Sequence, residues 1–282
     1  MYPILGTVAG VTIYSFTVTT IVAIVVASGV VGGEAGRRYL PARLWWRASL
    51  AAASGGLAGA RLWSLARGYG PGLVWYGGVA GGALAATVVL RAHRVRWLDG
   101  ADAIAPALAL GLAIGRLGCH LAGDGDWGPP TALPWGVRYV DGVASWPYPT
   151  EVRVHPSMLY EAAASVGIFL VLRRRRAAFW QWCVLAGGVR LLVEVVRREP
   201  VVAAGLTEAQ LVSVGLIALG TAGLARFRPD GPSRYGSPPC RRSPTTRACS
   251  SRPGPGSRWS RPASARSSVA RGARAPSTPT DG

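Results

Sequence analysis

Five ionisable side chains stand inside apolar stretches of the sequence and are the first candidates for chemistry: Arg61, Arg116, Glu161, Arg190 and Glu194. Charge at membrane depth is costly and usually marks a functional site. A guanidinium stays charged when buried and matches phosphate oxygens with a fork of donors, so several arginines facing one interior indicate a phosphate site. Arg190 and Glu194, four residues apart, share a helix face. A purely structural ion pair is the alternative for them, and Arg61 can equally extend to the membrane surface.

The densest polar cluster is a long segment between Arg116 and Glu161. It is too polar and too rich in glycine and proline to cross a membrane, and a loop of this length is usually functional or disordered. His120, Asp124 and His155 in this segment can each move a proton near neutral pH. Each alone can equally be a solvated or capping residue. The four cysteines do not have the spacing of a metal site or of a disulfide framework. They are Cys119, Cys183, Cys240 and Cys249.

The composition divides the chain into two unlike parts. Half of the 282 residues are apolar and 16% are charged, against about 25% charged in typical globular chains. In residues 229–282, however, 37 of 54 positions are Pro, Gly, Ser or Arg, which is too little apolar surface to offset the entropy of folding. We therefore predict a membrane domain over 1–228 and a disordered, basic cytoplasmic tail over 229–282. This composition argues against a secreted disulfide scaffold, a water-soluble enzyme and a nucleic-acid-binding protein.

Seven apolar runs approach the length of about 20 residues that a bilayer requires. They cover 10–31, 49–66, 72–90, 101–118, 157–172, 177–196 and 206–225. The six connections carry four, one, three, two, four and two arginines in order, and the segment after the last run carries many more. Arginine is retained in cytoplasmic loops, so this alternation places the N-terminus outside and the C-terminus in the cytoplasm. The predicted fold is an all-α integral membrane protein with seven transmembrane helices and a long polar outside loop between the fourth and the fifth.

Several short blocks, in the same order along residues 10–225, give the chain a family resemblance. They are Gly59-Ala60-Arg61-Leu62, Trp75-Tyr76-Gly77-Gly78, the segment from Gly115 to Gly128, the segment from His155 to Glu161, Arg190 to Glu194 with Arg198-Glu199-Pro200, and Leu206-Thr207 with Gln210 and Ser213. With these blocks the chain resembles the bacterial prolipoprotein diacylglyceryl transferases, integral enzymes of the cytoplasmic membrane. No single block is specific, but their shared order is.

The resemblance implies a reaction and assigns roles to residues. These enzymes move a diacylglyceryl group from phosphatidylglycerol to the thiol of the lipobox cysteine in a prolipoprotein signal peptide, forming a thioether. By resemblance Arg116 grips the lipid phosphate with help from Arg190, Glu194 orients Arg190, and His155 or Asp124 assists thiol deprotonation. The residues that the resemblance assigns to substrate binding are Arg116, Arg61, Tyr76, Gly77, Gly78, His120, Tyr160 and Glu161. It implies no metal and no organic cofactor.

The sequence also departs from the family pattern, and this keeps alternatives open. Tyr76 replaces a family histidine, Cys119 and Ala122 replace two asparagines, and Asp124 stands where the family has glutamate. One alternative is a relative that uses the same lipid donor on another thiol or hydroxyl. Another is a non-catalytic lipid-headgroup-binding protein or a small transporter, although the sequence has none of the internal repeats typical of transporters.

The tail gives a first testable prediction. Deletion of residues 229–282 should leave diacylglyceryl transfer unchanged, because the tail contains almost no residues able to pack against the membrane domain. Transfer by membranes containing the full-length or the truncated chain at equal amounts measures this. A loss of transfer in the truncated chain would contradict the predicted domain division.

Overall fold

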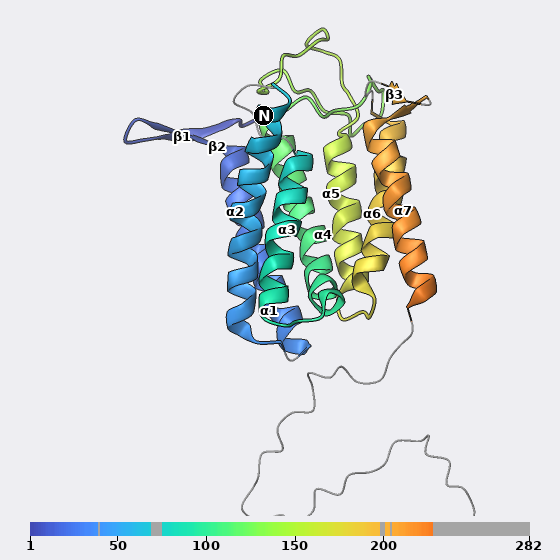
Figure 1. Ribbon diagram of the computed structural model, residues 1–282. Helices are drawn as coiled ribbons and strands as arrows, with labels where there is room; N and C mark the ends of the chain where they lie inside the picture. The colour runs from blue at the N-terminus through green and yellow to red at the C-terminus, as the bar shows by residue number, and fades with distance from the viewer. Residues whose placement is uncertain (39, 69–74, 198–200, 204, 228–282) are drawn as a thin grey trace, which may run out of the picture. The chain divides into compact units, whose positions relative to one another are not determined.

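The computed structural model describes residues 1–38, 40–68, 75–197, 201–203 and 205–227 (Figure 1). The chain divides into two compact units, 1–236 and 237–282. All described residues belong to the first unit. The last of them is Phe227, so the predicted tail over 229–282 lies outside the described residues.

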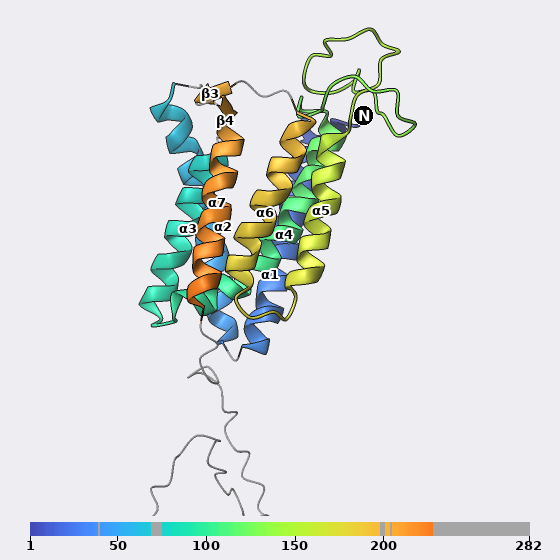
Figure 2. The same ribbon diagram turned by 90° about the vertical axis from the view of Figure 1, so that its right-hand side faces the viewer.

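The described part of the first unit is a bundle of seven helices with two small hairpins at one end (Figures 1 and 2). The helices are α1 Ser15–Arg37, α2 Ala42–Ala66, α3 Trp75–Ala92, α4 Trp97–Ala122, α5 Ser157–Leu172, α6 Ala178–Val195 and α7 Glu208–Arg226. The hairpins are β1 Ile4–Val8 with β2 Val11–Tyr14, and β3 Val201–Ala203 with β4 Leu206–Thr207. The prediction of a helical protein is confirmed.

Membrane-spanning character is clear for part of the bundle. Helices α1, α4, α6 and α7 are long and apolar enough to cross a membrane, whereas α5 and the stretch 77–92 of α3 are apolar but shorter. In α2 arginines and glycines lower the hydropathy. The protein is therefore a helical protein with several candidate membrane spans, and the full count of seven spans stays a prediction.

Several predicted boundaries were wrong, and two of them lie at the hairpin end of the bundle. The first helix begins at Ser15 rather than near residue 10, because the β-branched residues before it pair as β1 and β2 around Ala9 and Gly10. Both turn residues have positive φ, 49° and 80°, which suits the twist of a two-residue hairpin. The fourth helix continues to Ala122 rather than 118 and ends where Gly123 adopts the left-handed conformation. Arg116 therefore lies inside a helix and not at its end.

Helix α4 is the central helix and packs against α1, α5 and α6. Its buried Asp102 holds the start of α6, accepting hydrogen bonds from the backbone N–H groups of Ala177 at 3.0 Å and Phe179 at 2.9 Å. Arg38 at the end of α1 balances this carboxylate with an ion pair of 3.6 Å. Three helices are thus tied together at one end of the bundle.

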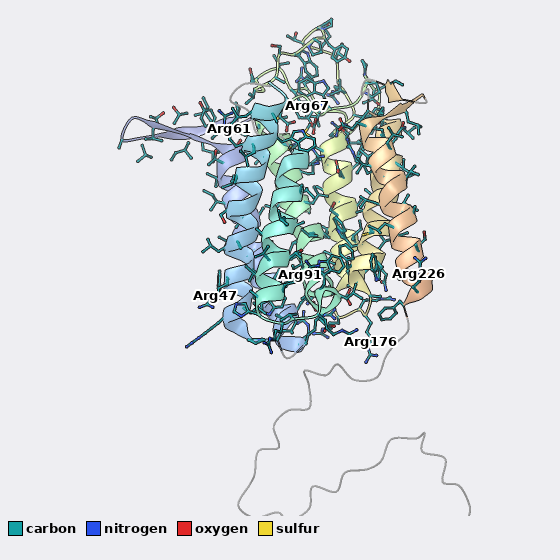
Figure 3. The ribbon with its side chains drawn as sticks, in the orientation of Figure 1. Arg47, Arg61, Arg67, Arg91, Arg176 and Arg226 are labelled. Atoms are coloured by element: carbon teal, nitrogen blue, oxygen red, sulfur yellow. The ribbon has the colours of Figure 1, made fainter. Side chains whose placement is uncertain are left out.

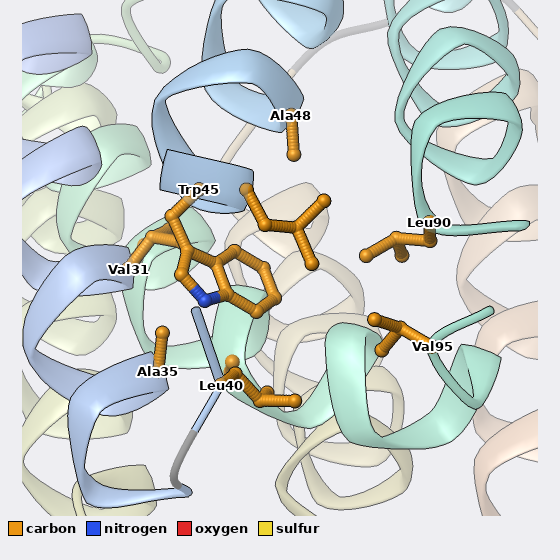
Figure 4. Packing of buried hydrophobic residues seen from close by; sticks show 10 residues of the cluster. Val31, Ala35, Leu40, Trp45, Ala48, Leu90 and Val95 are labelled. Carbon is orange, nitrogen blue, oxygen red and sulfur yellow. The ribbon is translucent and has the colours of Figure 1, made fainter. Parts of the chain in front are cut away.

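Helices α1 to α4 meet in an apolar cluster at the same end (Figure 4). Trp45 of α2 is its largest member and is only 2% exposed. It belongs to one cluster with Val31 of α1 and Leu90 of α3, and Ala103 of α4 completes the contact between the four helices. This cluster anchors the α2–α3 hairpin to the rest of the bundle.

The arginines that the figure labels are divided between the two ends of the bundle. Arg47, Arg91, Arg176 and Arg226 lie toward the end of the bundle where α7 terminates, whereas Arg61 lies toward the end with the hairpins (Figure 3). The helices run alternately up and down, so the arginine-rich connections share one face. The orientation of that face toward the cytoplasm stays a prediction.

Close glycine contacts join α2 to α3. A Cβ atom at Gly59 would overlap the carbonyl oxygen of Gly77 and lie 2.9 Å from the Cα atom of Gly81. Helices in lipid gain no hydrophobic energy from meeting each other, so small residues that permit close backbone packing are what holds such a pair.

This contact predicts the effect of one added methyl group. Gly59→Ala should lower the thermal unfolding midpoint because it forces α2 away from α3. The matched control is Gly29→Ala in α1, where an added Cβ meets no atom within 4 Å. The control gains the same helix propensity, about 1 kcal/mol, and should not be destabilised. Equal unfolding midpoints for the two variants in detergent would refute the packing role.

Candidate active site

Three helices bring arginines and carboxylates together at the hairpin end of the bundle. Arg116 of α4 is at the centre of this group. Its Nη1 atom lies 2.5 Å from Oδ2 of Asp126, and its Nε atom lies 2.8 Å from Oε2 of Glu161 at the start of α5. The guanidinium is therefore held from two sides by carboxylates that come from different segments.

Arg190 of α6 reaches the same glutamate. Its Nη1 atom lies 3.7 Å from Oε2 of Glu161, and its Nη2 atom lies 3.3 Å from Oε2 of Glu194, one turn further along α6. Glu194 in turn accepts a hydrogen bond of 2.7 Å from the hydroxyl of Thr207. Thr207 also caps α7 in a reciprocal pair with Gln210. The start of α7 is thereby fixed against the charged group.

The contacts form one alternating chain, which we call the arginine–carboxylate network. In order it runs through Arg197, Asp126, Arg116, Glu161, Arg190 and Glu194. Arg197 contributes the first contact, 2.6 Å from Oδ1 of Asp126. The three positive and three negative charges balance, which makes them tolerable inside a bundle of apolar helices.

Exposure within the network is unequal. The side chains of Arg116 and Arg190 are 18% and 22% exposed, whereas those of Glu161 and Glu194 are 6% and 1% exposed. Nη1 of Arg190 is buried without a hydrogen bond among the described residues. Asp126 is the most exposed member at 31%, and Arg197 is only 6% exposed. The network thus covers its two glutamates, while the side chains of Arg116 and Arg190 stay partly exposed and could meet an anionic ligand.

The two histidines predicted to act here are paired elsewhere. His120 is hydrogen-bonded through Nδ1 to the hydroxyl of Tyr139 at 2.8 Å, and His155 through Nδ1 to that of Tyr160 at 3.2 Å. Burial raises the pKa of Tyr139, so its hydroxyl stays protonated at neutral pH. Trp135 donates a further hydrogen bond of 2.8 Å to Tyr160. Within the described part of the chain, no hydrogen bond or ion pair joins either histidine to the network.

Asp124 lies closer to the network than the histidines do. Its carboxylate, that of Asp126 and Sγ of Cys119 all lie within 4.8 Å of one another. Asp124 is an exposed residue, but protein atoms packed around its carboxyl group raise its pKa. Such a group could hold a metal ion, but both oxygens of Asp126 already contact arginines. The grouping therefore fits an arginine clamp better than a metal site.

An apolar cavity of about 340 Å³ borders Asp124. Tyr14 at the end of β2 and Phe16 at the start of α1 line it together with Val143 of the long loop. The cavity therefore joins the N-terminal segment, the end of α4 and the loop at one place beside the carboxylate.

The remaining predicted site residues lie on the α2–α3 hairpin. Gly77 is buried against Gly59, and Gly78 faces α2 as well, so both glycines serve helix packing. Arg61 is partly buried on α2 toward the hairpin end (Figure 3). The side chain of Tyr76 and the block 198–200 lie outside the described residues. Substrate binding by these positions stays a prediction.

Sequence reasoning missed two members of the network. Asp126 stood out only as one of several acids in a loop, and Arg197 only as a loop arginine that reports topology. Helical spacing relates neither of them to Arg116. Only the return of the loop over the helix ends brings Asp126 between the two arginines, and no signal in a single sequence predicts that return.

Comparison with known proteins gives a family and named relatives. The model of the family "LGT: Prolipoprotein diacylglyceryl transferase" matches residues 3–226. A phosphatidylglycerol–prolipoprotein diacylglyceryl transferase of Finegoldia magna is 33% identical over 159 residues, which cover 54% of this chain and 60% of the relative. A protein of the same name from Xanthomonas campestris pv. campestris is 35% identical, and the match covers 56% of this chain and 62% of the relative. One from Cupriavidus metallidurans is 32% identical, and the match covers 53% of this chain and 57% of the relative. The chain thus spans about 60% of the length of these relatives.

The shared carboxylate of the network predicts a large loss of stability on neutralisation. Glu161→Gln should destabilise the protein by roughly 3–5 kcal/mol, because two partly buried guanidiniums lose their shared, buried partner. The control is Glu151→Gln, the same change at an exposed loop residue. Thermal unfolding in detergent compares the two. If Glu161→Gln unfolds at the same temperature as the control, the network is not a structural unit.

Proposed function

The chain belongs to the prolipoprotein diacylglyceryl transferase family, as its motifs predict, and from this premise we propose that it transfers the diacylglyceryl group of phosphatidylglycerol to a prolipoprotein cysteine. The observation that carries the proposal is the convergence on Glu161 of Arg116 and Arg190, whose side chains are partly exposed. The printed names of its relatives supply the substrate classes.

In the proposed reaction, the thiolate sulfur of the acceptor bonds to the glyceryl carbon that carries the phosphodiester. The bond from that carbon to the phosphate oxygen breaks, and glycerol phosphate leaves with the electron pair. The growing charge on the departing phosphate is stabilised by the forks of Arg116 and Arg190. Their carboxylate partners hold both guanidiniums in place before the lipid arrives, so little reorganisation is required during the reaction.

A base must take the thiol proton, since the thiolate is the nucleophile. We assign this role to Asp124, and His155 is the second candidate. Asp124 is favoured by its nearness to Asp126 in the network, by its raised pKa and by the apolar cavity beside it. That cavity suits the apolar residues of a lipobox around the acceptor cysteine. The bacterial cytoplasmic membrane and the outer half of the bilayer are the proposed location.

One observation keeps a second function open. Tyr76, Cys119 and Ala122 replace residues that the family pattern has as histidine and asparagines. A lipid-headgroup-binding protein that is non-catalytic, or that acts on another acceptor, would keep the arginines and lose these groups. A transfer assay distinguishes it from the proposed enzyme.

The assay uses full-length protein in vesicles with labelled phosphatidylglycerol and a peptide that contains a lipobox cysteine. Arg116→Lys should lower transfer by about 10²- to 10³-fold, because lysine keeps the charge but not the two-pronged phosphate contact. Arg67→Lys, the same change at an exposed arginine at the end of α2, should leave transfer unchanged. Equal losses in both variants would contradict the assignment of Arg116. Labelled lipid bound without labelled peptide would favour the non-catalytic alternative.

A further inference from the structure

A second amphipathic cavity lies at the opposite end of the bundle. It has a volume of about 370 Å³ and is formed by the start of α4, by α6 and by the end of α7. Arg96 and Arg226 contribute its cationic groups, and Trp180, Leu219 and Phe227 contribute apolar surface. The proposed transfer reaction uses none of these residues.

Neither arginine of this cavity is neutralised within the described part of the chain. The side chains of Arg96 and Arg226 are exposed, and no hydrogen bond or ion pair to a described residue occupies either of them. Arg38 at the same end differs, because Asp102 balances it at 3.6 Å. Two guanidiniums that line one cavity without a carboxylate make it attractive to an anion.

The indole ring of Trp180 is the largest apolar group that lines the cavity. The Trp180 indole lies so close to Gly223 of α7 that any side chain at that glycine would overlap the ring. On its other side Trp180 lies beside Trp97 at the start of α4, with 6.3 Å between the ring centroids. Leu219 lines the same cavity. The ring is therefore held between two helices, and its surface continues the apolar surface of α7.

The position along α4 places this cavity at the other membrane face. Arg96 precedes α4 and Arg116 lies 20 residues further on, which at 1.5 Å per residue is about 30 Å. This distance equals the thickness of the hydrocarbon layer, about 30 Å. Helices α4 and α7 are both long and apolar enough to span a membrane. A tryptophan beside arginines at such helix ends is typical of the membrane–water interface.

We propose that this cavity binds an anionic phospholipid of the membrane face opposite the active site. The phosphodiester would lie between Arg96 and Arg226, and an acyl chain would follow Trp180 and Leu219 toward the middle of the bundle. The tail over 229–282 carries ten arginines and two aspartates, so like charge disfavours it as the occupant. This site holds a lipid without reacting with it, and its existence does not depend on the transfer activity.

The test counts bound lipids on the delipidated full-length chain by native mass spectrometry during titration with phosphatidylglycerol. The variant Arg96→Gln/Arg226→Gln should bind one phosphatidylglycerol about 30-fold more weakly, which corresponds to two lost contacts of about 1 kcal/mol each. The matched control is Arg43→Gln/Arg47→Gln, which removes two exposed charges of α2 outside the cavity. It should retain the affinity of the wild-type chain.

A third variant separates cavity binding from charge. Ala222→Trp fills the cavity and keeps both arginines, so it should also lose the lipid, with a thermal unfolding midpoint like that of the wild-type chain. Equal weakening in the α2 control would overturn the proposal, because general surface charge would then explain binding. Equal affinity for phosphatidylcholine would overturn the choice of an anionic lipid. Displacement of the lipid by inorganic phosphate, with phosphate still bound to Ala222→Trp, would assign the cavity to free phosphate instead.

Discussion

Charges inside the helix bundle must be paired, and the pairing of Arg116 with Glu161 and Asp126 is the contact on which the active end of the molecule depends. It joins α4, α5 and the long loop, and through Glu161 it reaches Arg190 on α6. Buried ion pairs of this kind are rarely more stabilising than well-packed apolar side chains. A network of six charged groups is therefore poorly explained by stability alone, and it agrees with the proposed phosphate-binding role of Arg116 and Arg190.

The same constraint is met differently in the rest of the bundle. At the arginine-rich end Asp102 holds backbone N–H groups of the α5–α6 connection and of α6, and is balanced by Arg38. Helices α2 and α3 are joined by close contacts between glycine backbones rather than by the ion pairs found at the ends of α4. Packing by small residues brings these two helices together, whereas α4, α5 and α6 are joined through polar groups at the hairpin end. The arginine–carboxylate network thus belongs to one half of the bundle.

Helix α4 connects the two ends. It carries Asp102 near its start and Arg116 near its end, and these two residues take part in the two groups of charges. With 26 residues, α4 is long and apolar enough to cross a membrane. The cavity at Arg96 and the network at Arg116 consequently lie at opposite ends of α4.

The sequence by itself determined the helical architecture, four of the charged residues that meet in the network, and the family. Apolar runs, arginine counts and ordered motifs are local properties, so Arg116, Glu161, Arg190 and Glu194 were predicted to act together, and the structure brings them into contact. Helix ends were less predictable, as Ser15 and Ala122 show, because hairpin pairing and a left-handed glycine decide them. Only the tertiary structure decided that Asp126 and Arg197 complete the network and that His120 and His155 pair with tyrosines. Those contacts depend on how a long loop returns over the helix ends, and residue spacing along the chain does not encode that path.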